Sequence, residues 1–162
     1  FPDGTLISSA IAFGDLQARV ANVFDQQTYQ PGVWSDVLVG SPAGASYNDV
    51  VYPIAVSNHA TTDERWAIVF DGPTAVRVIG ETTGQVFSGS ITNPIAPVNP
   101  VAGEPYFTID PDGWGGGWQA GNVLRFNTIS ATKPIWAART TLQGPITVPT
   151  DSVRIQAYGN AH

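Results

Sequence analysis

The segment from Asp110 to Trp118 carries the residue types best suited to bind or transform a ligand. It reads Asp-Pro-Asp-Gly-Trp-Gly-Gly-Gly-Trp, so two carboxylates lie directly before two indoles that three glycines separate. Indole rings offer stacking surfaces, paired carboxylates can hydrolyse glycosidic bonds, and carboxylate oxygens suit Ca²⁺. Trp114 and Trp118 are therefore candidates for a surface that contacts a glycan or a partner chain, and Asp110 and Asp112 are weak candidates for metal ligands.

The same segment also has a purely structural interpretation, which we favour. Asp-Pro-Asp-Gly is typical of a turn, because Pro111 presets its own φ, aspartate side chains accept hydrogen bonds from nearby backbone N–H groups, and Gly113 tolerates a left-handed conformation. Glycines between the two indoles would let the backbone pass close by while both tryptophans fold over the open end of a β-domain.

The histidines give little support for nucleophilic catalysis. His59 lies in an Asn-His-Ala-Thr-Thr stretch typical of an exposed turn, and His162 is the last residue. A triad needs a base beside the nucleophile and a third group that orients the base. The chain also lacks cysteine, zinc-ligand spacing, a Walker loop and a dinucleotide fingerprint. We therefore expect no enzymatic activity and no cofactor.

Four arginines fall inside predicted strands, at Arg77, Arg125, Arg139 and Arg154. We expect them to be half-buried, with packed aliphatic stems and with guanidinium groups bonded to carboxylates or backbone carbonyls. Because the strands hold few acids, the partners would come from loops or from a neighbouring subunit. A simpler alternative places these arginines on solvated sheet faces. Arg125, Arg139 and the nearby Trp136 join the candidates for a contact surface.

Short β-rich runs separated by turn residues surround these candidates. Seven to nine strands at this spacing predict an all-β fold, an antiparallel β-sandwich or barrel-like domain with long Pro/Gly-rich loops. The ten candidate runs, from which these seven to nine strands would come, cover residues 5–13, 33–39, 50–56, 65–70, 75–80, 85–91, 106–109, 123–129, 135–140 and 152–158. We expect residues 1–162 to form a single β-domain.

Three local patterns refine this expectation. Asp71-Gly72 between residues 65–70 and 75–80 predicts a hairpin in which Gly72 can take a positive φ. Residues 15–24 place apolar side chains at helical spacing, so they form either one short helix or a strand. Residues 92–105 contain four prolines, which predicts an extended run across the surface rather than the interior of a sheet.

Composition excludes several classes of protein. Charged residues make up 12%, about half of the roughly 25% usual in soluble domains, and 17 Gly with 13 Pro point away from helical bundles. The hydrophobic content of 43% argues against disorder, and no apolar run approaches the roughly 18 residues of a membrane span. The net charge of −6 and the scattered arginines argue against nucleic-acid binding.

Several stretches resemble tail proteins of tailed bacteriophages and related prophages. The similarity extends over most of the chain, and in that family such segments usually lie at the C-terminal end of a larger structural protein of the tail tip or baseplate. The matching stretches are Asp-Leu-Gln-Ala-Arg-Val (15–20), residues 22–29, Trp-Ser-Asp-Val-Leu (34–38), Glu-Arg-Trp (64–66), Gly-Trp-Gly (113–115), residues 121–128, Pro-Ile-Trp-Ala-Ala-Arg-Thr (134–140) and Leu-Gln-Gly-Pro (142–145).

The resemblance implies a structural protein of the virion that assembles in the host cytoplasm with other virion subunits, as a homo-oligomer of C3 or C6 order. The start Phe-Pro-Asp-Gly, without Met, agrees with an origin in a longer polypeptide. Low charge fits a surface covered by neighbours, and the lack of Cys fits assembly in a reducing compartment. The prolines of residues 92–105 join the two indoles as predicted contacts. The alternative is a lectin-like or adhesin module that binds host-surface glycan through Trp114 and Trp118.

Overall fold

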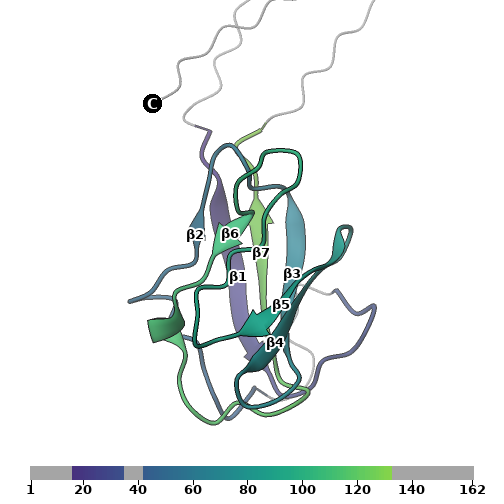
Figure 1. The fold of residues 1–162 in the computed structure, drawn as a ribbon, viewed down its shortest axis with the longest axis vertical. Helices are drawn as coiled ribbons and strands as arrows, with labels where there is room; N and C mark the ends of the chain where they lie inside the picture. Colours follow the sequence, from purple (N-terminus) through teal and green to yellow (C-terminus); the bar gives the residue numbers. More distant parts are fainter. Residues whose placement is uncertain (1–15, 35–41, 133–162) are drawn as a thin grey trace, which may run out of the picture.

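The computed structural model describes residues 16–34 and 42–132, and these residues form an all-β body with two antiparallel sheets (Figure 1). The predicted strands at 5–13, 135–140 and 152–158, together with Trp136, Arg139 and Arg154, lie outside the described residues. The larger sheet has the order β1-β7-β3-β4-β5 and the smaller one pairs β2 with β6. Their bounds are β1 Arg19–Gln26, β2 Ala55–Val56, β3 Glu64–Phe70, β4 Ala75–Gly80, β5 Gly84–Ser90, β6 Phe107–Thr108 and β7 Val123–Ile129. The predicted all-β, sandwich-like architecture is confirmed.

The main core lies between the two sheets. Trp66 on β3 is fully buried and meets Phe107 of β6 with ring centroids 5.0 Å apart, and Phe107 in turn meets Phe126 of β7 edge-to-face. The opposite face of β3 is buried as well, because Ala67 and Val69 form a second apolar cluster under aromatic side chains of the segment that follows β1. Burial of both faces explains why β3 is a continuous apolar run rather than an alternating one.

The helical alternative for residues 15–24 is wrong, because residues 19–26 form strand β1 against β7. The register shifts between Ala21 and Phe24, and Asn22 takes a φ of 54° in this bulge. A bulge inserts one extra residue, so Val20 and Val23 both pack on the core although they are three apart in sequence. The bulge therefore produced the spacing that resembled one face of a helix.

The predicted hairpin is confirmed, but its mechanism differs from the expectation. In the ladder of β3 and β4, Trp66 lies opposite Gly80 at one end and Phe70 lies opposite Val76 at the other. In the loop between them, the Asp71 backbone N–H donates to the Ala75 carbonyl at 2.9 Å. Gly72 is not among the glycines with positive φ, because a four-residue loop makes the turn without a left-handed residue. The next hairpin, from β4 to β5, does use a left-handed glycine, Gly84 with φ 72°.

The prediction that residues 92–105 run across the surface is only partly right. Pro94 and Pro100 are exposed, but Ile95 is completely buried and exchanges two backbone hydrogen bonds with Ile109. A further bridge joins Val98 to Pro105. The prolines leave the N–H of Ile95 free to pair, so the segment returns on itself as an irregular hairpin that closes the core.

Candidate functional site

The segment Asp110–Trp118 begins with the predicted turn. A short 3₁₀ turn covers Pro111–Gly113, and the Asp110 carboxylate accepts a hydrogen bond from the Asp112 backbone N–H at 2.9 Å. Within residues 16–34 and 42–132, no three histidine or acidic side chains gather as a metal site would require. The hydrogen bond from the Asp112 N–H to the Asp110 carboxylate is of the kind that the turn interpretation predicts.

A second loop holds this segment in place. Asn48 N–H donates to the Gly113 carbonyl and Gly115 N–H donates to the Ser46 carbonyl, both at 2.9 Å. Between them, the rings of Tyr47 and Trp114 meet edge-to-face at 4.8 Å. A side chain at position 113 would place its Cβ 2.6 Å from Tyr47 Cζ, so glycine is required there by this close approach.

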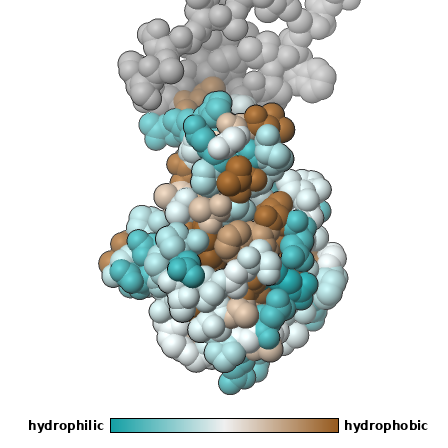
Figure 2. Space-filling view, viewed as in Figure 1, coloured by the Kyte–Doolittle hydropathy of each residue, from teal (hydrophilic) through white to brown (hydrophobic). Residues whose placement is uncertain are grey.

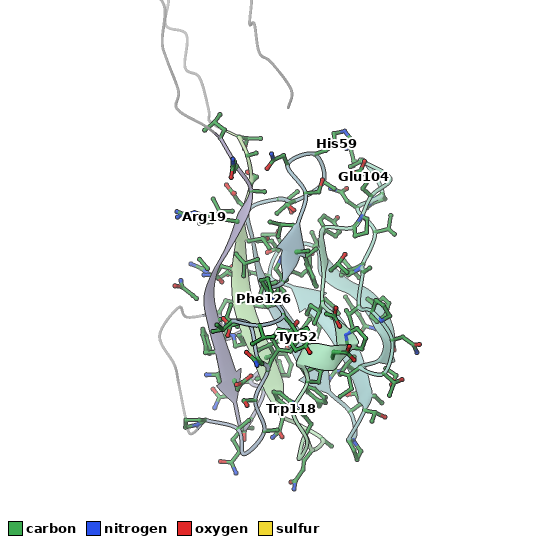
Figure 3. All side chains as sticks on the ribbon, turned by 90° about the vertical axis from the view of Figure 1, so that its left-hand side faces the viewer. Arg19, Tyr52, His59, Glu104, Trp118 and Phe126 are labelled. Atoms are coloured by element: carbon green, nitrogen blue, oxygen red, sulfur yellow. The ribbon has the colours of Figure 1, made fainter. Side chains whose placement is uncertain are left out.

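The two indoles turn inward. Trp118 is 3% exposed and stacks on Phe70, with centroids 4.3 Å apart and planes 2° apart. Trp114 is partly buried and meets both Phe70 and Trp118 edge-to-face at 5.5 Å. Figure 3 shows Trp118 toward one end of the body. In this conformation the loop closes the core, and a surface platform made of both indoles is not present.

One carboxyl group that sequence reasoning missed joins this region to the large sheet. Asp25, near the end of β1, accepts a hydrogen bond from the Tyr47 backbone N–H, while its Oδ1 is buried without a partner among the described residues. Burial raises the pKa of Asp25 to about 6, against the lowering effect of the Tyr47 N–H, and the charge of Asp49 raises it further. Burial likewise raises the pKa of Tyr47 to about 12.

Arg77 and Arg125, the two predicted strand arginines that the structure describes, have local partners. Arg77 donates to Asp71 in the β3–β4 loop at 3.0 Å and is half-buried, as expected from the loop-partner interpretation. Arg125 is only 5% exposed, and its guanidinium lies 5.6 Å from the ring centroids of both Phe24 and Trp34. Such cation–π contacts stabilise a buried guanidinium, so Arg125 serves packing on the outer face of the sheet rather than an exposed contact.

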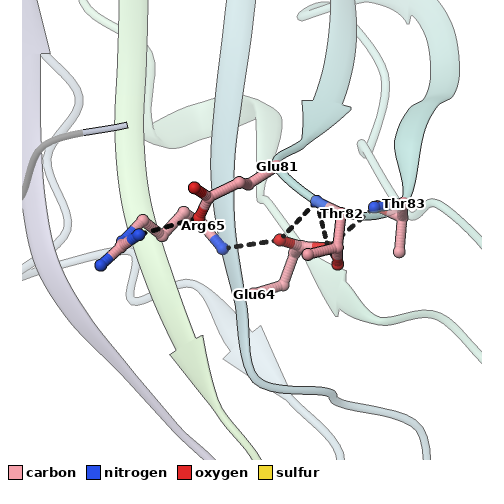
Figure 4. Close-up of polar contacts among 5 residues, drawn as sticks. All are labelled: Glu64, Arg65, Glu81, Thr82 and Thr83. Atoms are coloured by element: carbon pink, nitrogen blue, oxygen red, sulfur yellow. Dashed lines mark hydrogen bonds and ion pairs between the residues drawn. The ribbon is translucent and has the colours of Figure 1, made fainter. Parts of the chain in front are cut away.

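An open groove, lined mostly by polar residues, crosses the start of β3 and the end of β7 and has a volume of about 430 Å³. One of its residues is Glu64, which is 6% exposed. Its carboxylate accepts hydrogen bonds from the backbone N–H groups of Thr82 and Thr83, as well as a short one from the Thr82 hydroxyl (Figure 4). Next to it, Arg65 forms an ion pair with Glu81 at 2.9 Å. These contacts fasten the β4–β5 turn to β3, a structural role for the Glu-Arg-Trp stretch.

His59 lies beside an acid and a hydroxyl, but not as a catalytic triad. Glu104 stands between them: its Oε2 accepts from the Ser57 hydroxyl at 3.1 Å and its Oε1 is 3.6 Å from His59 Nδ1. A triad requires the imidazole between serine and acid, whereas here the carboxylate takes that place. The His59 side chain is also 69% exposed, in agreement with the predicted turn.

The turn that contains His59 supports one exposed apolar feature, residues 97–105, which we call the valine tip; another is the pair Val50 and Val51. Val101 is 94% exposed and Val98 is 55% exposed. Asn99 holds the tip: its side chain donates to the Ala60 carbonyl at 2.8 Å and accepts from the Val101 backbone N–H at 3.0 Å. The buried side-chain amide of Asn99 therefore fixes the backbone that carries the two exposed valines. The sequence signal was the Asn-Pro-Val run inside a proline-rich stretch.

The valine tip and the tryptophans lie at opposite ends of the body. Figure 3 shows Glu104 of the tip and His59 together at one end and Trp118 toward the other. On the face drawn in Figure 2, apolar side chains form small patches separated by pale and teal residues, so the surface offers no single broad apolar area there. Among the described residues, no helix is long and apolar enough to cross a membrane.

Comparison with models of protein families, with curated proteins and with solved structures finds no match to this chain.

Proposed function

We propose that this chain is a non-enzymatic structural protein of a phage tail tip or baseplate, and that it acts through contacts with other protein subunits. The observation that carries this proposal is the valine tip. A valine that is 94% exposed buries almost no apolar surface in the isolated fold and so adds almost no hydrophobic stabilisation, whereas covering it with a partner would remove that surface from water.

The rigidity of the tip favours recognition over a chance exposure. Ser57 makes two hydrogen bonds: its hydroxyl donates to the Glu104 carboxylate, and its backbone N–H donates to the Thr61 hydroxyl oxygen. The Thr61 hydroxyl in turn donates to the Tyr106 carbonyl at 2.7 Å. Together with Asn99, these bonds fix the tip before binding, so that a partner would lose less conformational entropy on contact.

The alternative of a glycan-binding module loses its main support. It needs two indole faces open to a sugar, whereas Trp118 is stacked on Phe70 and 3% exposed. Within residues 16–34 and 42–132, the one contact between an imidazole and an acid lacks triad geometry. Subunit contact remains the function that the described geometry supports best.

The test uses phage particles purified from a host that carries the encoding phage or prophage. Quantitative mass spectrometry should detect this chain at the abundance of a structural protein. Val101→Asp should strongly reduce its incorporation, because a charge would be buried in the contact, whereas Val50→Asp, at another strongly exposed valine outside the tip, should leave it unchanged. Absence of the wild-type chain from pure particles would overturn the proposal.

A further inference from the structure

The two edges of the large sheet differ in how they are protected. An edge strand presents unpaired backbone N–H and C=O groups, and proteins usually block it with charge, proline, bulges or a covering segment. β1 has these devices: it carries Arg19 and Asp25, it contains the bulge at Asn22, and just before it the Ala18 N–H is bonded by the Asn58 side chain. A partner strand is therefore discouraged at β1.

β5 lacks most of these devices. Its sequence, Gly-Gln-Val-Phe-Ser-Gly-Ser, has no charge and no proline, and within the described residues it pairs with β4 alone. The register with β4 shifts so that Val86 is the extra residue, which leaves the regular part of the edge at Phe87–Ser90. Ser88 and Gly89 are exposed there.

The hydrogen-bond pattern identifies which backbone groups are open. The Ile91 N–H donates to the Thr74 carbonyl, so Ile91, Gly89 and Phe87 direct their backbone groups toward the hairpin. Because this direction alternates in an antiparallel ladder, Ser88 and Ser90 direct theirs outward. Among the described residues, the edge therefore leaves two donors and two acceptors without a partner strand, although the Ser90 carbonyl also accepts from the Asn93 N–H at 3.2 Å.

We propose that β5 pairs antiparallel with β5 of a second copy of this chain, about a two-fold axis at Gly89. Ser88 of each copy would then oppose Ser90 of the other and exchange four backbone hydrogen bonds across the axis. This inference deepens the proposed function, since it names a second copy as one partner. The pairing would join two five-stranded sheets into one.

Side chains at the axis suit a close approach of identical strands. The Phe87 ring lies over Gly89, where an added Cβ would come within 2.8 Å of the ring. A perpendicular two-fold axis keeps both rings on the same face, so the two partly buried Phe87 rings would meet above the glycine pair. Aromatic rings that meet in this way attract each other, and they would cover the exposed glycine backbone.

Charge also permits a second copy, although the chain carries a net charge of −6. The two acids near the ends of β5 are already paired within the subunit, Glu81 with Arg65 at 2.9 Å and Asp71 with Arg77 at 3.0 Å. Pairing β5 with itself also closes after two subunits, whereas β5 on β1 would leave a free edge at each end and continue into a filament.

Sedimentation velocity of the full chain over a wide concentration range tests the pairing. We expect a dimer that strengthens with concentration. Ser88→Pro removes an outward N–H without touching the β4 ladder, and it should weaken dimerisation about 10- to 100-fold, because two of the four hydrogen bonds are lost. Ser88→Ala keeps the N–H and should dimerise like the wild type. Circular dichroism verifies that both variants are folded.

Disulfide trapping tests the register, with a clean background because the chain has no cysteine. Directly opposed residues lie about 5.5 Å apart, within disulfide reach, whereas diagonal ones at about 7–8 Å are not. Mixing Ser88→Cys with Ser90→Cys should therefore give a mixed disulfide dimer, and each variant alone should give little. A monomer at every concentration, a dimer indifferent to Ser88→Pro, or trapping of Ser88→Cys alone would each overturn the inference. Its failure leaves incorporation into particles, the test of the proposed function, unaffected.

Discussion

Replacing Asp25 by asparagine should stabilise the fold at neutral pH and leave it almost unchanged in acid. The folded-state pKa of Asp25 is raised from 3.8 to about 6, chiefly by burial. For a raised carboxyl pKa, the folded state holds the proton more tightly than the unfolded chain. The stabilising contribution of protonated Asp25 to the free energy of unfolding is therefore fully present below pH 3.8 and is lost as the pH rises to about 6.

The magnitude follows from the same values. One pKa unit corresponds to about 1.36 kcal/mol, so the shift sets an upper bound of about 3 kcal/mol on the cost of ionising Asp25 in the fold. Asp25 is only partly buried, and water screens its charge, so we expect ionised Asp25 to lower the free energy of unfolding by about 1–2 kcal/mol above about pH 6.5. Asparagine has the same shape and keeps an oxygen that can accept from the Tyr47 N–H, but it carries no charge. The stability advantage of Asp25→Asn over the wild type, measured as the free energy of unfolding, should thus be about 1–2 kcal/mol larger at pH 7.5 than at pH 4.

Urea unfolding followed by tryptophan fluorescence at pH 4, 5, 6 and 7.5 measures this difference, and titration of the other acids cancels between the two proteins. Asp49→Asn is the matched control: it removes only the smallest contribution to the Asp25 pKa, so its effect should have the same direction and be clearly smaller. A difference between Asp25→Asn and the wild type that does not change with pH, or that grows in acid, would refute the reasoning.

Two substitutions test the packing of the core. Gly113→Ala should lower the free energy of unfolding by about 1–3 kcal/mol through a clash with the Tyr47 ring, whereas Gly116→Ala, which has open space, should change it by less than about 0.5 kcal/mol. Thr128→Val should lower the free energy of unfolding by about 1–3 kcal/mol, because the buried Trp66 indole N–H would lose its acceptor at 2.8 Å. Thr128→Ser keeps the hydroxyl and should lower it less. Chemical denaturation measures both pairs of variants, and equal effects within a pair would contradict the contact assigned to it.

Local patterns predicted the strands of the large sheet that form consecutive hairpins. β7 lies at residues 123–129 as expected, and the hairpin of β3 and β4 was visible from its turn and its β-branched runs. β1 was ambiguous because its bulge at Asn22 is set by pairing with β7, about 100 residues away in sequence, and no local pattern contains that partner. Ile95 was missed for a similar reason, since its partner Ile109 closes the hairpin from beyond the prolines.

The candidate site was less predictable than the fold, because residue type does not reveal which way a side chain points. Trp114 and Trp118 are residue types that often form a binding platform, yet their contacts with Phe70 place Trp118 in the core and Trp114 against it. Asp25 gave no signal at all, because its surroundings include Tyr47 and Asp49, which lie more than about 20 residues further along the chain. The exposure of Val101 likewise depends on Asn99 reaching across to the turn at residues 57–61.

An electron cryomicroscopy map of intact particles tests the central claim most directly, that this chain is a structural subunit acting through contacts. The proposal predicts density for the body formed by residues 16–34 and 42–132 in the tail tip or baseplate, with Val98 and Val101 buried against a neighbouring subunit. A particle without this body, or one in which both valines face solvent, would contradict it.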